Sequence, residues 1–298
     1  MERRDFFEKV IVNSFIKTTG YSAIVFVGAI LFFMLGEGLP VLQDISIGDL
    51  FGDRWYPIEG YYGILPLVGG SIVVTIGATL VAVPLGLGSA IFIAEIAPRW
   101  VREILKPTIE ILAGLPSVVL GFIGIVTLSP IVAEFFNLPT GLSAFTGSIL
   151  LGAIAIPTIV SVAEDALDSV PEEYRNAALA MGATPWETIW GITLPAARSG
   201  VLTAIMLGIA RAIGETMTVM MVTGNAPILP TGLDAFVSPV RTMTATIAAE
   251  MGEVADGSTH YHILFFIGIV LFLISLVINV TASAMVFRQK KRSEKLLS

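Results

Sequence analysis

The sequence contains no cysteine and carries little charge. Without cysteine the chain has neither a disulfide framework nor a thiolate metal site. Charged residues make up only 14% of the 298 positions, whereas hydrophobic residues make up 55% and the mean hydropathy is +0.85. Soluble globular chains carry roughly a quarter of their residues as charges. The composition therefore excludes that class and indicates an integral membrane protein.

Motifs that would place catalysis on this chain are also missing. The sequence has no Gly-x4-Gly-Lys-Ser/Thr phosphate loop, no His-Glu-x2-His zinc motif and no Gly-x-Ser-x-Gly nucleophile elbow. We therefore expect that this chain is not an enzyme by itself and binds no cofactor of its own.

Six apolar runs are long enough to cross a bilayer, which takes roughly 20 residues in a helix. Strands of a membrane barrel would alternate apolar and polar residues, but Tyr21 to Leu35 is apolar on every face. We expect an all-α integral membrane protein with six transmembrane helices in one permease domain over 20–287. The predicted spans lie near 20–36, 64–94, 107–128, 144–162, 200–222 and 261–287.

Lysine and arginine are distributed unevenly between alternate loops. One set of loops holds four in residues 1–20, three in 95–106, two in 163–199 and five in the tail. The opposite loops hold only Arg54 and Arg241. Because positive charge marks the cytoplasmic side, both termini are expected in the cytoplasm, with 288–298 as a basic tail. The net charge of −7 gives no indication of nucleic-acid binding.

The N-terminal segment 1–19 has an amphipathic pattern. Phe6, Phe7 and Val10 fall on the side opposite Glu8 and Lys9 at helical spacing. This pattern predicts a helix lying along the inner membrane surface; the alternative is that the segment simply extends the first span.

The long outer loop 223–260 contains a second helical pattern. Pro239 at a first helical position and Gly252 as a stop predict a helix between them. This helix either caps the outer mouth of a pathway or lies at the membrane interface. Its charged residues Arg241 and Glu250 are candidates for an outer gate.

His260 and His262 follow that helix at the outer boundary of the last span. A metal site normally needs three or four ligands, and two histidines at a membrane boundary do not form such a set by themselves. We therefore interpret the two histidines as interfacial and predict no metal site.

The one large cytoplasmic loop, 163–199, has the pattern of two short helices. Ser169 with Glu172, and Thr184 with Glu187, have the spacing of capping boxes. Gly182 breaks the chain between them. Such a helix pair, projecting from the inner face, is suited to docking in a groove of a partner. Side chains available to that partner include Tyr174, Ala177, Ala178, Met181, Trp186 and Ile189.

The pattern Asn-Ala-Ala-x3-Gly-x9-Ile-x-Leu-Pro, from Asn176 to Pro195, closely resembles the EAA loop of ABC importer permeases. The resemblance implies that this element couples the membrane subunit to an ATPase subunit. One departure is that Asn176 stands where the family has glutamate; Glu172 and Glu173 lie one turn earlier. The residues expected to contact the ATPase are Tyr174, Asn176, Ala177, Ala178, Gly182, Trp186, Glu187, Leu194 and Pro195.

Two ionisable residues interrupt the fifth span, in the stretch RAIGETMTVMMVTGN (211–225). A charge at mid-membrane depth costs at least about 2.5 kcal/mol, so Arg211 and Glu215 must face protein or water. On a continuous helix they share one face with Thr218. They form either a structural salt bridge or part of an oxyanion pathway. Guanidinium suits an oxyanion, and an ionised Glu215 would accept a hydrogen bond from protonated phosphate but repel sulfate.

That stretch resembles the Arg-x-x-Gly-Glu-Thr…Gly-Asn signature of phosphate importer permeases. The segments RTMTATIAAEMGE (241–253) and GSTHYHILFFIG (257–268) resemble the PstC-type subunit more than its PstA-type companion, and LPSVVLGFIG (115–124) is similar to a segment that both types share. The resemblance covers about 64–287 and implies a type I ABC importer permease fold. By implication, Arg211, Glu215 and Thr218 line a phosphate pathway.

The same resemblance implies a prokaryotic inner-membrane complex. Its other members would be a second permease of the PstA type, two PstB-like ATP-binding subunits that hold ATP and magnesium, and a PstS-like phosphate-binding protein. We expect this chain to translocate inorganic phosphate delivered by that binding protein. The alternatives are a permease for sulfate or molybdate, or the PstA-type companion itself.

Overall fold

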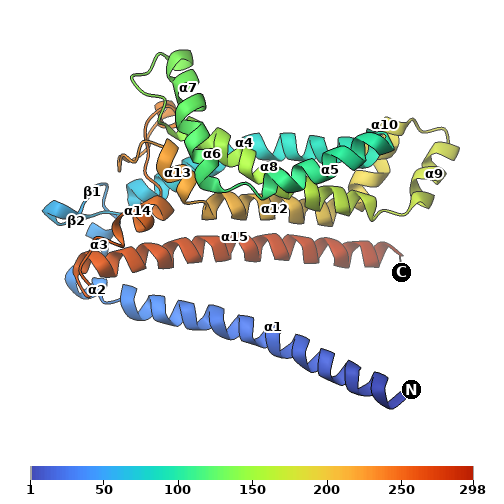
Figure 1. Cartoon of the computed structure of the whole chain (residues 1–298), viewed down its shortest axis with the longest axis horizontal. Helices are drawn as coiled ribbons and strands as arrows, with labels where there is room; N and C mark the ends of the chain where they lie inside the picture. The colour runs from blue at the N-terminus through green and yellow to red at the C-terminus, as the bar shows by residue number, and fades with distance from the viewer. Residues whose placement is uncertain (1, 298) are drawn as a thin grey trace.

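The computed structural model describes the backbone of residues 2–297 and the side chains in that range except those of 2–11, 233, 282 and 285–297. The chain is almost entirely helical (Figure 1). In chain order the elements are α1 (Glu2–Gly38), α2 (Val41–Asp44), α3 (Ile47–Leu50), β1 (Trp55–Tyr56), η1 (Pro57–Glu59), β2 (Tyr61–Tyr62), α4 (Leu65–Ile91), η2 (Phe92–Ile96), α5 (Arg99–Ala113), α6 (Ser117–Ile123), η3 (Gly124–Leu128), α7 (Ser129–Phe136), α8 (Ala144–Asp168), α9 (Glu172–Ala180), α10 (Pro185–Thr188), η4 (Ile189–Thr193), α11 (Leu194–Ala196), α12 (Arg198–Gly214), α13 (Met217–Val222), η5 (Leu233–Phe236), α14 (Met243–Glu250) and α15 (Thr259–Leu297).

Helices α4, α8 and α12 form the centre of the bundle, with α8 between the other two. Small residues allow the close approach: a Cβ on Gly152 of α8 would come within 2.9 Å of the Val81 side chain of α4. A Cβ on Gly208 of α12 would collide with the Ile159 side chain of α8. This packing is typical of helices in lipid, where small residues let backbones approach.

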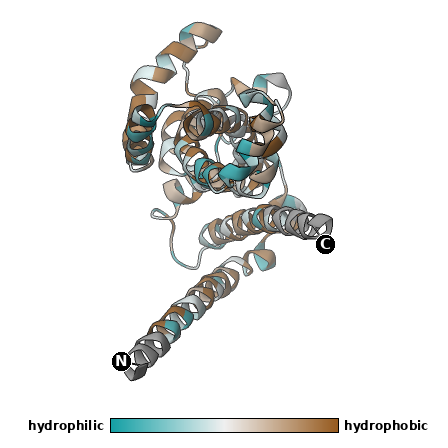
Figure 2. Cartoon of the chain, turned by 90° about the vertical axis from the view of Figure 1, so that its right-hand side faces the viewer, coloured by the Kyte–Doolittle hydropathy of each residue, from teal (hydrophilic) through white to brown (hydrophobic). Residues whose placement is uncertain are grey.

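The first and last helices lie at the edge of this bundle. Near its C-terminal end α1 packs on α15, where the rings of Phe33 and Phe265 meet edge to face at 5.7 Å. Toward its N-terminus α1 diverges from α15 and from the rest of the molecule (Figures 1 and 2). Four consecutive apolar residues there are exposed, so every face of the helix is apolar: Ile24, Val25, Phe26 and Val27.

The N-terminal segment does not form a helix of its own. Residues 2–38 are a single continuous helix, with no break at the predicted boundary after residue 19. The alternative, in which this segment extends the first span, therefore describes the backbone. The amphipathic side chains before residue 12, like the basic side chains of the tail, lie outside the described residues; the backbone of the tail continues α15 to Leu297.

Within the described chain, five helical stretches are long and apolar enough to cross a membrane: Val12–Asp44, Leu65–Ile96, Ser117–Phe136, Ala144–Asp168 and Thr259–Thr281. A sixth is the helix pair Pro185–Ala196 and Arg198–Gly214, which is bent by 75°. The prediction of a mostly helical membrane protein is confirmed. The small exception to an all-α fold is the antiparallel hairpin of β1 and β2, in which Trp55 pairs with Tyr62.

The third span lies further along the chain than predicted. The expected span 107–128 is interrupted between Ala113 and Ser117, where α5 ends and α6 begins. Pro116 lacks an amide hydrogen and its ring would clash with the preceding turn, and its backbone is extended at ψ 131°. The apolar stretch that is long enough to span is therefore Ser117–Phe136, and α5 is a separate helix beside α8.

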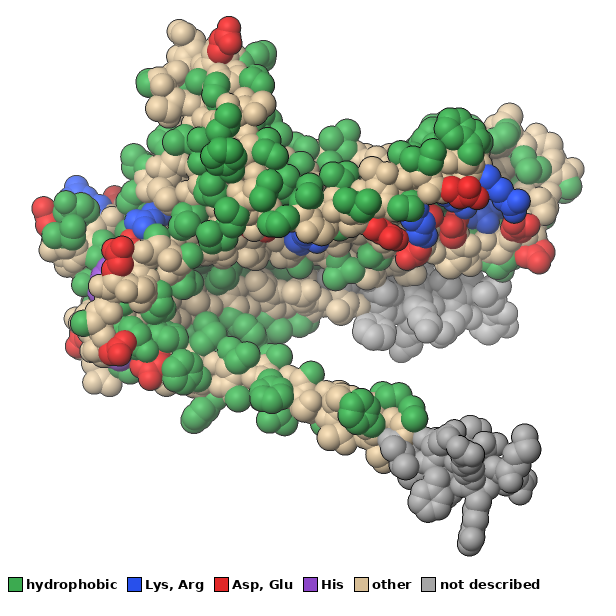
Figure 3. All heavy atoms as spheres, viewed as in Figure 1, with side chains coloured by type: hydrophobic (Ala, Val, Ile, Leu, Met, Phe, Trp, Pro, Cys, Tyr) green, Lys and Arg blue, Asp and Glu red, His purple; other side chains and the backbone are tan. Residues whose placement is uncertain are grey.

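Charged side chains concentrate toward the two ends of the molecule, and apolar side chains cover the middle of the face shown in Figure 3. One end carries α9 and α10, and the two chain termini lie toward this end (Figure 1). The other end carries α2, α3, the hairpin and α14 around a core that includes Trp55, Met243 and Leu264. These two ends hold the candidate sites, and Arg211 lies between them on α12.

Candidate functional site

Arg211 lies in the last turn of α12 and bridges two neighbouring elements. Its Nη1 donates to the hydroxyl oxygen of Thr158 on α8 at 3.1 Å, and its Nη2 donates to the main-chain oxygen of Ala113 at the end of α5 at 3.1 Å. The contact of Gly208 with Ile159 sets this arrangement, because it brings α12 against α8 one turn before Arg211 and next to Thr158.

Glu215 does not share a helical face with Arg211, contrary to the sequence prediction. Helix α12 ends at Gly214, and Glu215 has an extended backbone with ψ 131°. Its main-chain oxygen accepts a hydrogen bond from the Thr244 hydroxyl at 3.0 Å. The predicted fifth span 200–222 therefore breaks at residues 215–216, and α13 is a separate short helix.

Thr218 faces a different neighbour from Arg211. It is buried in α13, and its hydroxyl donates to the main-chain oxygen of Ser117 at the start of α6 at 2.9 Å. Its amide lies 3.5 Å from a carboxylate oxygen of Glu215, a long hydrogen bond by ordinary standards. Arg211, Glu215 and Thr218 thus flank the break after α12 and the α5–α6 junction, but they do not form one stripe.

The positive charge of Arg211 has no carboxylate partner among the residues that the structure describes. Both of its recorded partners, Thr158 and Ala113, are neutral oxygens. The salt-bridge interpretation of Arg211 and Glu215 is therefore wrong for this structure. A guanidinium with a full charge and exchangeable neutral partners is suited to receiving an oxyanion through charge-assisted hydrogen bonds.

Arg241 and Glu250, the candidates for a gate, do come together. Arg241 Nη1 lies 2.8 Å from Glu250 Oε1, and both side chains are largely buried. The same carboxylate accepts from Trp55 Nε1 at 3.2 Å and meets His260 Nε2 at 2.8 Å. One carboxylate thus joins α14, the β1–β2 hairpin and the first turn of α15.

The helix that carries Glu250 is shorter than expected. It was predicted from Pro239 to Gly252, but α14 begins at Met243 with Thr242 as its N-cap and ends at Glu250. The cause is tertiary: the amide of Val240 donates to the Thr223 main-chain oxygen at 2.8 Å, so residue 240 is held in a bridge outside the helix.

Neither His260 nor His262 lies in a metal-binding group within the described residues. His260 contacts Glu250, and His262 Nδ1 lies 2.6 Å from the main-chain oxygen of Glu37 at the end of α1. Both side chains connect the first turn of α15 to other elements.

The loop 163–199 forms the predicted pair of short helices, α9 and α10. Gly182 lies between them at φ +90°, a conformation that L-residues avoid. Thr184 and Glu187 form a complete capping box: the Thr184 hydroxyl accepts from the Glu187 amide, and the Glu187 carboxylate accepts from the Thr184 amide at 2.8 Å. The predicted start of α10 is confirmed.

The predicted capping box at Ser169 is wrong. Ser169 caps the end of α8, and its hydroxyl donates back to the Ala166 main-chain oxygen at 2.7 Å. Helix α9 begins at Glu172, after Pro171. The hydroxyl that would have capped α9 is thus already used by the preceding helix.

The loop leaves several large side chains exposed. Tyr174 and Trp186 are each 57% exposed, and Trp186 stacks edge to face on Trp190 at 5.8 Å. Asn176, Ala177, Gly182, Glu187 and Pro195 are also exposed, whereas Ala178 and Leu194 are partly covered. Ile189, predicted as available to a partner, is only 4% exposed because it packs in the core formed by the ends of α4 and α8.

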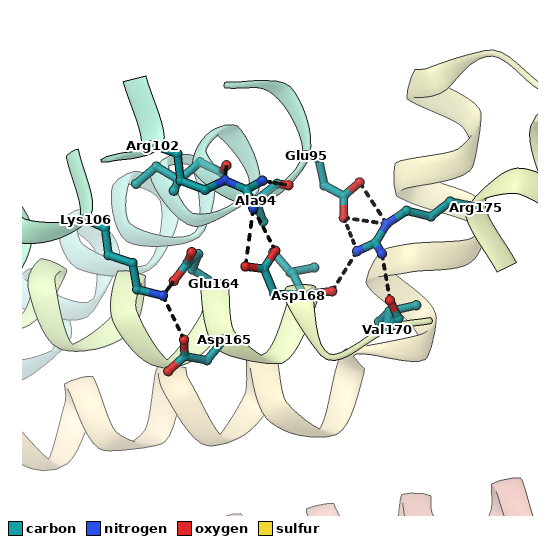
Figure 4. A network of polar contacts seen from close by, with 11 residues as sticks. Ala94, Glu95, Arg102, Lys106, Glu164, Asp165, Asp168, Val170 and Arg175 are labelled. Atoms are coloured by element: carbon teal, nitrogen blue, oxygen red, sulfur yellow. Dashed lines mark hydrogen bonds and ion pairs between the residues drawn. The ribbon is translucent and has the colours of Figure 1, made fainter. Parts of the chain in front are cut away.

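Arg175 anchors the exposed helix α9 to the bundle. Its Nη2 lies 2.8 Å from Glu95 Oε1 in η2, and its Nε lies 3.2 Å from the same oxygen. Its Nη1 and Nη2 also donate to the main-chain oxygens of Val170 and Leu167 at 2.7 and 2.8 Å. Figure 4 shows this guanidinium between Glu95 and the end of α8.

A second cluster of charges ties α5 to the same region (Figure 4). Lys106 contacts Glu164 at 2.7 Å and Asp165 at 3.2 Å, and these carboxylates raise the pKa of Lys106 in spite of its partial burial. Arg102 donates to the main-chain oxygens of Ile93 and Ala94 and lies 3.4 Å from Asp168. Helix α5 is therefore fastened to α8 and to η2 along its length, and its last carbonyl meets Arg211.

Sequence reasoning had missed these ionic contacts. A signal was present, because Arg102 and Lys106 lie one turn apart on the positive loop and the acidic residues 164, 165 and 168 lie close together at the end of the fourth span. Their pairing required knowledge that α5 runs beside α8. Nothing in the sequence singled out Thr158 as a partner of Arg211.

The central and C-terminal parts of the chain match one protein family. Residues 82–294 match the family described as "Binding-protein-dependent transport system inner membrane component". Among curated proteins, the chain is 42% identical to the "Probable ABC transporter permease protein YqgH" of Bacillus subtilis (strain 168), over 74% of this chain and 72% of that protein. It is 33% identical to the "Phosphate transport system permease protein PstC" of Xylella fastidiosa (strain Temecula1), over 97% and 93% of the two chains.

Solved structures with a similar fold are also ABC transporters. A chain of the MetNI methionine ABC transporter aligns over 76% of this chain and 94% of its own, with a TM-score of 0.56 and 17% identity. A chain of a bacterial ABC transporter involved in the import of alginate aligns over 92% and 97%, with a TM-score of 0.56 and 14% identity. At these identities the likeness concerns the fold alone.

Proposed function

Since the chain belongs to the binding-protein-dependent transport system inner membrane component family, and is thus a multi-pass inner-membrane permease component of an ABC importer, we propose that its substrate is inorganic phosphate. The observation that carries the proposal is the guanidinium of Arg211, whose hydrogen-bond partners among the described residues are two neutral oxygens. The PstC name of several relatives supports the same substrate.

Arg211 would bind the anion as it passes between α8, α12 and the α5–α6 junction. A tetrahedral oxyanion would take the place of the Thr158 and Ala113 oxygens on the terminal nitrogens. The exchange gains a charge-assisted hydrogen bond, which is roughly twice as strong as a neutral one. The full charge of Arg211 favours this exchange because its partners among the described residues are neutral oxygens and not carboxylates.

Glu215 would select the anion. An ionised carboxylate only accepts hydrogen bonds, and hydrogen phosphate offers it a proton whereas sulfate does not. Glu215 follows Arg211 by four residues, beyond the end of α12. Within the described part of the chain, the one hydrogen bond to its carboxylate is the long one from the Thr218 amide. It therefore has acceptor capacity to spare. Thr218 would support the lining by holding α13 against α6.

The α9–α10 pair would dock on an ATPase subunit. Its exposed residues include Tyr174 and Trp186, which are large enough to fill a groove. Movement of α9 would reach the bundle through Arg175 and Glu95. From there α5, fastened by Arg102 and Lys106, would transmit it to the Ala113 oxygen that holds Arg211. Domain closure on ATP would thus change the surroundings of the anion site.

The complete importer would contain a second permease of the PstA type, two PstB-like ATP-binding subunits and an external PstS-like phosphate-binding protein. ATP and magnesium would be bound by the ATP-binding subunits. Both termini of this chain would lie in the cytoplasm, on the same side as α9 and α10. Moving a multivalent anion into a negatively charged cell costs energy, which gives ATP coupling its purpose.

Substrate choice can be tested with the complex in vesicles. ATP-driven uptake of labelled phosphate is measured with the binding protein outside and with unlabelled phosphate, sulfate or molybdate as competitor. The proposal predicts that only phosphate competes at concentrations near the KM. The binding protein is saturated with phosphate in this assay. If sulfate or molybdate then inhibits uptake as strongly as unlabelled phosphate does, the permease itself does not select phosphate.

A further inference from the structure

Thr158 has an unusual role among the threonines of the spans. It lies in the middle of α8, and its hydroxyl oxygen accepts a hydrogen bond from Arg211 Nη1 at 3.1 Å. The two residues come from different helices, 53 positions apart in sequence. The contact therefore depends on the packing of α12 against α8.

Several other threonine hydroxyls donate to a carbonyl of their own segment. Those of Thr79, Thr203 and Thr223 donate to the carbonyl four residues earlier, at 2.8 to 2.9 Å. Thr158 makes no such recorded bond to its own helix within the described chain. Its oxygen is an acceptor in the only contact that it makes there.

The hydrogen-bond chemistry of Arg211 leaves the hydroxyl proton of Thr158 without an acceptor in this pair. Arginine has donors only, so the hydroxyl must act as the acceptor in this pair. A hydroxyl keeps one O–H to donate in addition to its lone pairs. The Thr158 proton is therefore uncommitted, and it lies beside a cation that has no carboxylate partner among the described residues.

We propose that the Thr158 hydroxyl is a second ligand of the transported oxyanion and that it sets, together with Arg211, the affinity of the transient site. The proposal rests on the phosphate path through Arg211 described above. An oxyanion with several oxygens accepts from the terminal nitrogens of Arg211 with one edge and from the Thr158 hydroxyl with a neighbouring oxygen. Donors from α8 and α12 then meet on one anion, so its binding depends on the two helices staying in register.

Thr79 offers a matched control. It lies on α4 in the same bundle and is partly buried like Thr158, but its hydroxyl donates to the Thr75 main-chain oxygen at 2.8 Å. Replacing it by valine removes a hydroxyl from a membrane helix without removing a contact to Arg211. Thr158→Ser keeps the hydroxyl and removes only the methyl group.

The test is ATP-driven uptake of labelled inorganic phosphate by vesicles that contain the whole complex, with assembly and thermal stability checked for each variant. Thr158→Val is expected to raise the KM about tenfold with little change in the maximal rate, since one hydrogen bond to a charged group is lost. Thr158→Ser should stay within about threefold of the wild-type KM, and Thr79→Val should match the wild type.

The outcomes separate this proposal from the one on which it rests. If Arg211→Gln abolishes phosphate uptake while Thr158→Val keeps the wild-type KM, the Thr158 ligand is refuted and the phosphate path stands. A Thr158→Ser variant as poor as Thr158→Val, or a lower maximal rate at unchanged KM, would also refute it, because both results indicate a structural role. A wild-type complex that imports no phosphate would overturn both proposals.

Discussion

Arg175 and Glu95 form an ion pair between two elements that are far apart in sequence. The Nη2 and Nε atoms of Arg175 lie 2.8 and 3.2 Å from one carboxylate oxygen of Glu95, and the side chains are only 18% and 8% exposed. One residue belongs to the exposed helix α9 and the other to η2 at the end of α4. The pair is therefore an ionic connection between the exposed helix α9 and the central bundle.

Breaking this pair should uncouple the loop from the bundle. Arg175→Ala leaves the buried Glu95 carboxylate without its partner, which typically costs about 3 kcal/mol. We expect a lower thermal midpoint of the purified complex, and ATP hydrolysis that no longer responds to the loaded binding protein. Arg198, which is exposed at the start of α12, supplies the control variant Arg198→Ala. If Arg175→Ala behaves like that control in both measurements, the pair does not transmit movement.

Gly182 is expected to be required for its backbone conformation and not for the space around it. A Cβ there would meet nothing within 4 Å, but φ is +90°; the left-handed region costs an L-residue about 1 to 2 kcal/mol. Gly182→Ala should therefore change the angle between α9 and α10 and weaken co-purification of the ATP-binding subunits. Gly191→Ala is the matched control, since that position also has open space and lacks a positive φ. If both variants co-purify with equal amounts of the ATP-binding subunits, the prediction is contradicted.

The Lys106 contacts predict a pH dependence with a definite sign. Glu164 and, to a lesser extent, Asp165 raise the pKa of Lys106 above its usual 10.5. A raised pKa contributes stability that is fully present below pH 10.5 and is lost as the pH rises through the raised value. The thermal midpoint of the wild type should therefore exceed that of Lys106→Met by a constant amount between about pH 6 and 9. The difference should close only above pH 10.5; a difference that closes near neutral pH would contradict the assignment.

The carboxylate of Glu250 is expected to act as a clamp at the outer end. Glu250→Gln weakens the contacts to Arg241 and His260, each at 2.8 Å, and the loss of a hydrogen bond to a charged group costs about 2 kcal/mol. We predict a lower thermal midpoint and an unchanged KM for phosphate. Phosphate leakage through Glu250→Gln vesicles without ATP would instead identify the pair as the outer gate.

Composition and local signals were sufficient for much of the fold. The membrane helices could be predicted because the length and polarity of an apolar run are properties of the run itself. The start of α10 could be predicted because the capping box of Thr184 and Glu187 depends only on residues close together in sequence. Two breaks in the predicted spans were missed. Glu215 leaves the helix because Thr244 and Thr218 bond to neighbouring elements, and the α5–α6 break shifts the third span because Pro116 lies inside an unbroken apolar run.

The candidate sites also combine residues that could be identified from the sequence with contacts that could not. Arg211 was found because a charge in an apolar run is visible in sequence, but its partners were not. Thr158 and the Ala113 carbonyl reach it only through the packing of α12 on α8 and the end of α5. The expected common face of Arg211 and Glu215 required a continuous helix, and the tertiary contacts that break α12 removed it.

The most direct test is ATP-driven uptake of labelled phosphate by vesicles containing the whole complex, with wild type compared with Arg211→Gln, Glu215→Gln and the double variant after equal assembly is confirmed. Arg211 and Glu215 are not paired with each other in the described chain, so each single change should abolish or strongly reduce uptake, and the double variant should remain inactive. Recovery of transport in the double variant would show that the two charges only neutralise each other, and would contradict a phosphate path through Arg211.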